Sequence, residues 1–262
     1  MLPRSIMHRG GRGVHEVCSF RGSHRVAADV RRGLREGVHS RSAAVKGTAM
    51  LMLPEFFSRA RQRLTFDVPA GFADPDVIPR NYQHAADPAL IAAFAAVRPV
   101  RTAAVLVPVI ERDEPSVLFT QRTTRLADHG GEISFPGGKI DSSDATPAAA
   151  ALREAEEEIA LSRRLVDPIG YLDIHLTPFG HRIMPVLARV QPGFALRLNP
   201  GEVEDTFEVP LTFLMSPQNF TSENRDWNGL TLSLHAIRFG ERNIWGATAG
   251  ILRNLYEKVC RR

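Results

Sequence analysis

The amino-acid sequence predicts a layered α/β fold in which helices and strands intermix within one domain. Segments with helical spacing of apolar residues alternate with short apolar runs of strand length over most of the chain. The 262 residues are 44% hydrophobic, which suits one soluble domain with extensions. The longest apolar run near the middle, residues 103–110, is far shorter than the ~20 residues that a membrane-spanning helix needs. We therefore expect no membrane partner.

Residues 1–49 differ in composition from the rest of the chain. They hold ten Lys or Arg against three Asp or Glu, and they lack a sustained apolar period. Such a segment cannot bury enough surface to offset its chain entropy, so we expect a disordered basic extension. A targeting peptide, a basic arm that contacts anionic polymers, and a translation start at Met50 or Met52 are the alternatives.

The remaining chain has 23 basic and 26 acidic residues, so its charge does not predict nucleic-acid binding by the folded domain. The two cysteines, Cys18 and Cys260, lie in the extension and at the C-terminus, which implies no disulfide framework. A reducing cytoplasm fits this pattern. A homodimer is compatible with it.

Residues 50–97 predict an N-terminal helical and linker segment. A short helix is expected over 54–63, and Pro and Asp punctuate a linker over 74–87. A second helix starts at Pro88, with Asp87 as its N-cap, because Leu90, Ile91, Phe94 and Val97 have helical spacing.

From Arg101 the pattern predicts strands with helices between them. A hairpin is expected from strands 102–110 and 116–121, joined by a turn at 112–115, and a loop follows over 122–131. Further strands are expected at 132–135, 167–174, 182–190 and 230–239, and helices at 146–160, 210–216 and 247–259.

The predicted helix 146–160 has an acidic face. Glu154, Glu157 and Glu158 are spaced i, i+3 and i+4, so their carboxylates lie within about 6 Å of each other on one face. Three like charges repel, and a divalent cation such as Mg2+ explains the arrangement because it takes oxygen ligands and bridges them to phosphates. A solvated Glu/Arg face is the alternative.

The rest of this helix is predicted to pack on a sheet. Leu152, Ala155 and Ile159 form its apolar face, while Thr146 can cap its start and Pro147 occupies its first position.

Gly138 followed by residues 153–161, Arg-Glu-Ala-Glu-Glu-Glu-Ile-Ala-Leu, resembles the Nudix box. Two positions depart from the common pattern. Asp144 stands where a Glu is usual, with one extra residue before Arg153, and Ala160 stands where the pattern has its terminal Gly.

Residues 118–138, LFTQRTTRLADHGGEISFPGG, resemble the signature of coenzyme A pyrophosphatases within the Nudix superfamily. The matching positions are Thr120, Arg122, Gly131, Phe135, Pro136, Gly137 and Gly138. Thr123 replaces a Ser, and Ala127 stands where the signature has its second Arg. Segments 202–211 and 244–252 also resemble this subfamily. The spacing from Asp141 through Asp144 to residues 152–155, Leu-Arg-Glu-Ala, is also the spacing seen in this subfamily.

The resemblance implies a Nudix domain over 98–260, with a mixed β-sheet sandwiched between α-helices. It implies hydrolysis of the diphosphate of coenzyme A or its thioesters, with Mg2+ or Mn2+ as cofactor, to 3′,5′-ADP and 4′-phosphopantetheine or its acyl form. ADP-ribose, NADH or a nucleoside triphosphate would suit the same metal helix. A catalytically silent binding module is the alternative outside enzymes.

Candidate site residues follow from the chemistry and the resemblance together. The metal ligands are Glu154, Glu157, Glu158 and, by similarity to the family, the Gly138 carbonyl; the catalytic residues are Arg153, Glu154, Glu158 and Glu202. The substrate-binding residues are Arg122, Thr120, Gly131 and Gly137. Glu204 is a second candidate for the general base, and Glu202 is preferred. Four aromatic residues could stack on adenine or fill cores: Phe135, Phe179, Trp227 and Trp245.

Overall fold

An eight-stranded mixed sheet lies at the centre of the described residues. The structure is a computed structural model that describes residues 53–261, except for residues 75, 80–86, 127, 128 and 228, all within one unit of the chain, Thr48–Arg262. The main strand order is β3-β2-β1-β7-β5, with β4 paired to β1, β6 to β7 and β8 to β2. The strands are β1 (Arg101–Ile110), β2 (Ser116–Arg122), β3 (Ile133–Ser134), β4 (Gly137–Lys139), β5 (Val166–Tyr171), β6 (His175–Leu176), β7 (His181–Val190) and β8 (Val203–Pro210).

Strands β1 and β7 run parallel through the middle of this sheet. Ten residue pairs align them, from Arg101 with His181 to Ile110 with Val190. Both strands read as near-continuous apolar runs, as expected for strands covered on two faces. The predicted hairpin is confirmed, because β1 pairs antiparallel with β2 across the 111–115 turn.

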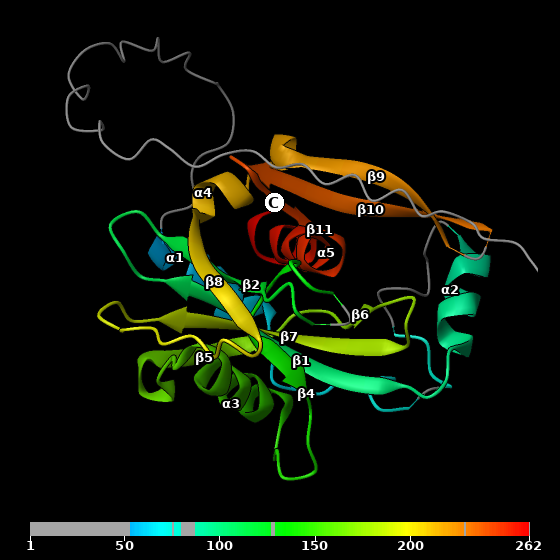
Figure 1. The fold of residues 1–262 in the computed structure, drawn as a ribbon, viewed down its shortest axis with the longest axis horizontal. Helices are drawn as coiled ribbons and strands as arrows, with labels where there is room; N and C mark the ends of the chain where they lie inside the picture. The colour runs from blue at the N-terminus through cyan, green and yellow to red at the C-terminus, as the bar shows by residue number, and fades with distance from the viewer. Residues whose placement is uncertain (1–52, 75, 80–86, 127–128, 228, 262) are drawn as a thin grey trace, which may run out of the picture. The chain divides into compact units, whose positions relative to one another are not determined.

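Helices cover both faces of the sheet (Figure 1). Helix α3 (Pro147–Ile159) packs against one face through Ala151, Ala155 and Ile159. Helices α1 (Leu53–Arg63) and α5 (Gly246–Leu255) share a core with the other face. The predicted arrangement, a mixed sheet between helices, is therefore confirmed.

A second, three-stranded sheet was not predicted as a sheet. Its order is β11-β10-β9, with β9 at Phe220–Trp227, β10 at Leu230–Phe239 and β11 at Arg242–Trp245. Of these three strands, only β10 has an apolar pattern that is visible in the sequence. The polar strand β9 is recognisable only through its antiparallel pairing with β10.

Several predicted boundaries change. The expected strand 167–174 is shorter, because β5 ends at Tyr171 and the two-residue strand β6 begins only at His175. The expected helix 210–216 is the single turn α4 (Leu211–Leu214). Helix α5 ends at Leu255 and a π-helical turn continues as η4 (Tyr256–Cys260). Among the described residues, 3-10 turns also form at η2 (Arg163–Leu165) and η3 (Pro217–Asn219).

The N-terminal part of the described chain is built into the same core. Phe56 of α1 is 1% exposed and packs with residues of β2 and α5, so the expected division at residue 98 is not a division in packing. Helix α2 (Pro88–Ala96) starts as predicted, with the Asp87 carboxylate accepting from the N–H groups of Ala89 and Leu90. The predicted extension 1–49 and much of the linker 74–87 lie outside the described residues.

Candidate active site

Helix α3 begins and ends with well-formed caps that fix its register. The Thr146 hydroxyl accepts from the Ala149 N–H at 3.1 Å, with Pro147 at the first helical position. At the other end, Ala160 has φ 55°, and the N–H groups of Ala160 and Leu161 bond back to the carbonyls of Glu156 and Ala155. This left-handed ending explains why glycine is usual at position 160 in the motif that the segment resembles.

Gly137 and Gly138 allow β4 to lie directly against β1 and α3. A Cβ at Gly137 would stand 2.4 Å from the Ala104 carbonyl oxygen. A Cβ at Gly138 would stand 2.6 Å from the carboxylate carbon of Glu154. The two glycines therefore bring the backbone to the acidic face of the helix, as predicted for a close approach.

Arg153 hydrogen-bonds to four groups on this side of α3. Its guanidinium pairs with both oxygens of Asp144, at 3.1 and 2.9 Å, and one nitrogen, Nη1, contacts Glu154 at 2.9 Å and Glu157 at 3.0 Å. It also donates to the Lys139 carbonyl at 3.1 Å. The pKa of Arg153 is raised, first by the hydrogen bond to Asp144. Asp144 thus pairs with Arg153 in spite of its shorter side chain and the extra residue.

Glu158 is the most buried carboxylate of the site, at 2% exposure. One of its oxygens accepts the Gly137 N–H at 3.2 Å. Burial raises its pKa to about 7, and the neighbouring charges of Glu202 and Glu154 add to this, while Arg122 opposes it. Burial also raises the pKa of Glu154, with further contributions from Glu157 and Glu202. The four glutamates therefore act on one another as a cluster.

Glu202 and Glu204, the two candidates for the general base, have different surroundings. Glu202 is the one whose charge acts on Glu154 and Glu158, and its Oε1 accepts from the Asn199 side chain at 3.0 Å. Both oxygens of Glu204 are occupied, by the Gln121 side chain at 3.0 Å and the Thr124 N–H at 3.1 Å. These surroundings favour Glu202 over Glu204 as the candidate general base.

Arg122 lies at the end of β2, close enough to Glu158 to lower that residue's pKa. Its Nε is buried and has no hydrogen-bond partner within the part of the chain that the structure describes. A buried, unpaired donor is unfavourable. A phosphate oxygen would satisfy it.

Two other predicted substrate contacts are placed differently. Thr120 is 1% exposed, and its hydroxyl bonds to Ser134 across the β2–β3 pair, so this placement argues against the predicted contact with substrate. Gly131 has φ 78° and its N–H donates to the Arg122 carbonyl at 3.0 Å. Gly131 therefore shapes the loop that returns the chain to β3. Ala127, the departure from the second motif, lies outside the described residues.

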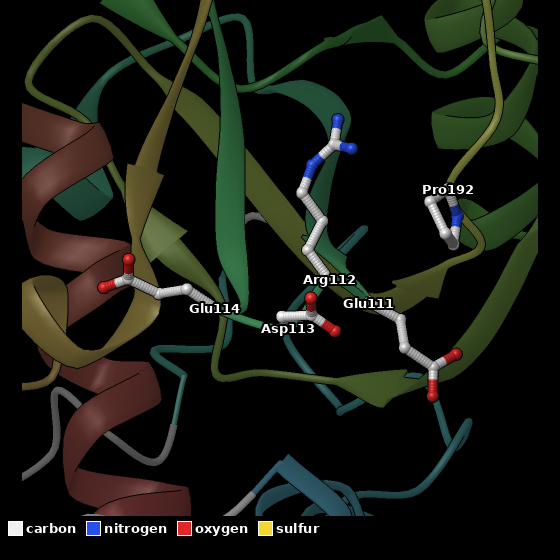
Figure 2. A pocket seen from close by; sticks show the side chains of 5 residues that line it. All are labelled: Glu111, Arg112, Asp113, Glu114 and Pro192. Atoms are coloured by element: carbon white, nitrogen blue, oxygen red, sulfur yellow. The ribbon is translucent and has the colours of Figure 1, made fainter.

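Two surface hollows differ in their relation to these residues. The larger, about 730 Å³, surrounds the β1–β2 turn and is lined by Glu111, Arg112, Asp113, Glu114 and Pro192 (Figure 2). This turn follows the end of β1, whereas β4 and its glycines pair with the first half of that strand. The smaller, about 390 Å³, is lined by residues that flank Arg122 and Glu202. Neither hollow is lined by Arg122, Glu202 or the glutamates of α3.

The comparisons with known proteins agree on a family. The NUDIX domain model matches residues 100–228. The uncharacterized Nudix hydrolase NudL of Escherichia coli strain K12 is 37% identical over 155 residues, which are 59% of this chain and 81% of NudL, and NudL of Shigella boydii serotype 4 matches equally. This chain belongs to the Nudix hydrolase family. Among solved structures, the MutT protein of Methanosarcina mazei Go1 is 16% identical with a TM-score of 0.41, covering 62% of this chain and 94% of that one.

Nudix hydrolases generally use divalent metals such as Mg2+ or Mn2+. Among the described residues, no three His, Cys, Asp or Glu side chains converge as a ready-made metal centre. Instead of meeting as the three predicted ligands, Glu154 and Glu157 share Nη1 of Arg153, while Glu158 bonds to Gly137. The donors nevertheless fit a hard cation, because they are all oxygens, and a cation would relieve the repulsion by which Glu154, Glu157 and Glu202 raise the pKa values of Glu154 and Glu158.

The aromatic residues considered for stacking mostly have other contacts in this Nudix hydrolase. Phe135 is 3% exposed and stacks on Phe119 in the core. Trp227 packs against Phe94, and Arg225 lies over the ring of Trp245. Phe179 is 53% exposed. No described helix is long and apolar enough to cross a membrane.

Proposed function

We propose that this Nudix hydrolase cleaves the diphosphate linkage of coenzyme A or its thioesters, releasing 3′,5′-ADP and 4′-phosphopantetheine or acyl-phosphopantetheine. One observation carries the proposal. Arg122, from the segment that resembles the coenzyme A signature, lies beside Glu158 with a buried Nε that lacks a partner among the described residues. A guanidinium at that position suits a phosphate of the substrate.

The chain's own residues would divide the work as follows. Glu154, Glu157, Glu158 and the Gly138 carbonyl would hold Mg2+ or Mn2+. The bound ion would neutralise phosphate oxygens and lower the pKa of water. Glu202 would take the proton from the attacking water, since its charge acts on Glu154 and Glu158. Arg153 would hold Glu154 and Glu157 in place through its paired contacts.

A different nucleotide is the second candidate substrate. ADP-ribose, NADH and nucleoside triphosphates all carry a phosphate anhydride that the same residues could hydrolyse. Ala127, where the coenzyme A signature has an Arg, is the specific feature that favours this alternative. A silent binding module is disfavoured because burial of Glu158 among like charges is unfavourable without a catalytic use.

The decisive experiment is a substrate panel with the purified protein and Mg2+. Coenzyme A, an acyl-coenzyme A, ADP-ribose, NADH, diadenosine polyphosphates and dNTPs would be compared by kcat/KM, with products identified by mass. We expect 3′,5′-ADP from coenzyme A at the highest efficiency. A higher efficiency with ADP-ribose or NADH would overturn the coenzyme A assignment, and hydrolysis of no substrate would favour the binding module.

Arg122→Ala tests the contact that carries the proposal. We expect kcat/KM for coenzyme A to fall by roughly tenfold or more, the scale of one lost phosphate contact. Arg163→Ala is the control, because that exposed arginine bonds only to Glu156 among the described side chains. Dephospho-coenzyme A locates the contact: a defect that disappears with it assigns Arg122 to the 3′-phosphate, and an equal defect assigns it to the diphosphate.

A further inference from the structure

The chain after β7 returns to the end of α3 and occupies carbonyls that the helix leaves unpaired. The N–H of Arg197 donates to the Ile159 carbonyl at 3.1 Å, and the N–H of Asn199 donates to the Glu158 carbonyl at 2.8 Å. Carbonyls in the last turn of a helix need such partners. Asn199 is therefore tied by its backbone to Glu158, one of the proposed metal ligands.

Asn199 also closes the turn that leads into β8. Its carbonyl accepts the N–H groups of Glu202 at 3.0 Å and Val203 at 2.8 Å, and its Oδ1 accepts the Gly201 N–H at 3.1 Å. Pro200 restricts the backbone at the next position. The position of Glu202 relative to Asn199 is thus defined by several bonds.

The side-chain amide of Asn199 then reaches the Glu202 carboxylate. Its Nδ2 donates to Glu202 Oε1 at 3.0 Å. The orientation of the amide is defined, because a flipped amide would set an N–H against the Gly201 N–H and an oxygen against the carboxylate. With Oε1 bound, rotation of the carboxylate is restricted. Within the described residues, no hydrogen bond is made to Oε2.

We propose that Asn199 is a positioning residue, which orients the Glu202 carboxylate and couples its place to the Glu158 end of α3. The inference rests on the proposed role of Glu202 as general base. A proton acceptor works only when its oxygen is held in the correct direction, and a residue locked by its own bonds can hold it there. The sequence offers a weak signal for this role, since Asn-Pro-Gly marks a turn without indicating what the side chain contacts.

Two substitutions separate the hydrogen bond that Asn199 donates to Glu202 from the bond that its side chain accepts within the turn. Asn199→Ser keeps a short oxygen that can accept the Gly201 N–H, but it lacks the amide donor to Glu202. Asn199→Asp keeps the acceptor and replaces the donor with a repelling oxygen. We expect Asn199→Ser to lower kcat at least tenfold with KM within twofold, and Asn199→Asp to lower it further.

Asn254 provides a matched control. Its Nδ2 donates to the Asp173 carboxylate at 2.8 Å and its Oδ1 accepts the Asp173 N–H at 3.1 Å, which repeats the two contacts of Asn199 between α5 and the segment after β5. We expect Asn254→Ser to lower the melting temperature as much as Asn199→Ser does while kcat stays within twofold of wild type. A similar fall in kcat for both variants would mean that general destabilisation explains the effect, and it would overturn the proposal.

A double-mutant cycle with Glu202→Gln tests the coupling. If Asn199 acts through Glu202, adding Asn199→Ser to Glu202→Gln should change kcat by less than twofold. An undiminished loss in that background would refute the proposal, as would wild-type kcat for Asn199→Ser or for Glu202→Gln. All variants are compared on whichever panel substrate the wild type hydrolyses fastest. Failure of the coenzyme A assignment therefore leaves this test intact.

Discussion

Substitution of Glu158 with Gln should stabilise the metal-free protein at alkaline pH while it removes activity. The folded structure raises the pKa of Glu158 from 4.5 to about 7, chiefly by burial. The folded state therefore holds this proton more tightly than the unfolded state does, and stability falls as pH rises between these two values. Above pH 7 the loss of folding stability caused by ionised Glu158 reaches its full value of about 3 kcal/mol, at 1.36 kcal/mol for each pKa unit.

Glutamine carries no such penalty. Its buried amide costs the same at every pH, so the comparison between two pH values isolates the charge. In chelator, the stability of Glu158→Gln relative to wild type should rise by about 2 kcal/mol from pH 5 to pH 8. The melting temperature difference should change by roughly 4–8 °C, at about 2–4 °C for each kcal/mol in a domain of this size. With Mg2+ present, kcat should fall about 100-fold or more.

Glu156→Gln is the control for this prediction. Glu156 is exposed on the same helix and pairs with Arg163, so the same chemical change there removes no buried carboxylate and should not reproduce the effect of Glu158→Gln. Thermal denaturation by circular dichroism at both pH values, in chelator, measures the effect. A pH-independent difference for Glu158→Gln would refute the reasoning from burial, and hydrolysis at the wild-type rate would refute the assignment of Glu158 to the metal.

Two further predictions concern the backbone around α3. Ala160→Gly should raise stability by roughly 0.5–1 kcal/mol. The left-handed conformation of Ala costs about 1–2 kcal/mol, and about 0.4–1 kcal/mol of the gain from removing it is lost because Gly gives the unfolded chain more conformational freedom. An unchanged or lower melting temperature would contradict this prediction. Gly138→Ala should lower kcat at least tenfold with little change in melting temperature, because the new Cβ meets the movable Glu154 carboxylate. Gly137→Ala should instead lower the melting temperature, because its Cβ meets the Ala104 backbone, and the prediction fails if the two variants behave alike.

The elements that the sequence predicts well are those whose pattern is local. Helix α3 was expected over 146–160 and occupies Pro147–Ile159, because its capping residues and its apolar face are both visible in the sequence. Strand β4 was not expected, because Gly137, Gly138 and Lys139 have no strand propensity and pair with β1 only through close approach. The polar strand β9 and the four-residue strand β11 depend in the same way on β10 as a partner.

In the candidate site, too, the features with a local sequence pattern are predicted and those that depend on distant residues are not. The spacing on α3 predicts which carboxylates share a face, but it does not predict that Glu158 is buried or that Glu157 turns to Arg153. The choice between Glu202 and Glu204 depends on the loop around Asn199, about 40 residues from α3 in sequence. Contacts of this range have no local signature.

The burial of Glu158 follows from the helix that carries it. Ala155 and Ile159 must face the sheet, and position 158 lies beside both on a helix of 3.6 residues per turn. Burial of an Ile side chain contributes about 2–3 kcal/mol, which is comparable to the roughly 3 kcal/mol that ionised Glu158 costs. The apolar contact can therefore hold the carboxylate in a place that it would not adopt alone. The core residues of α3 thus set the electrostatics of the site, and a mutation that loosens Ile159 would relax Glu158 toward an ordinary, solvated glutamate.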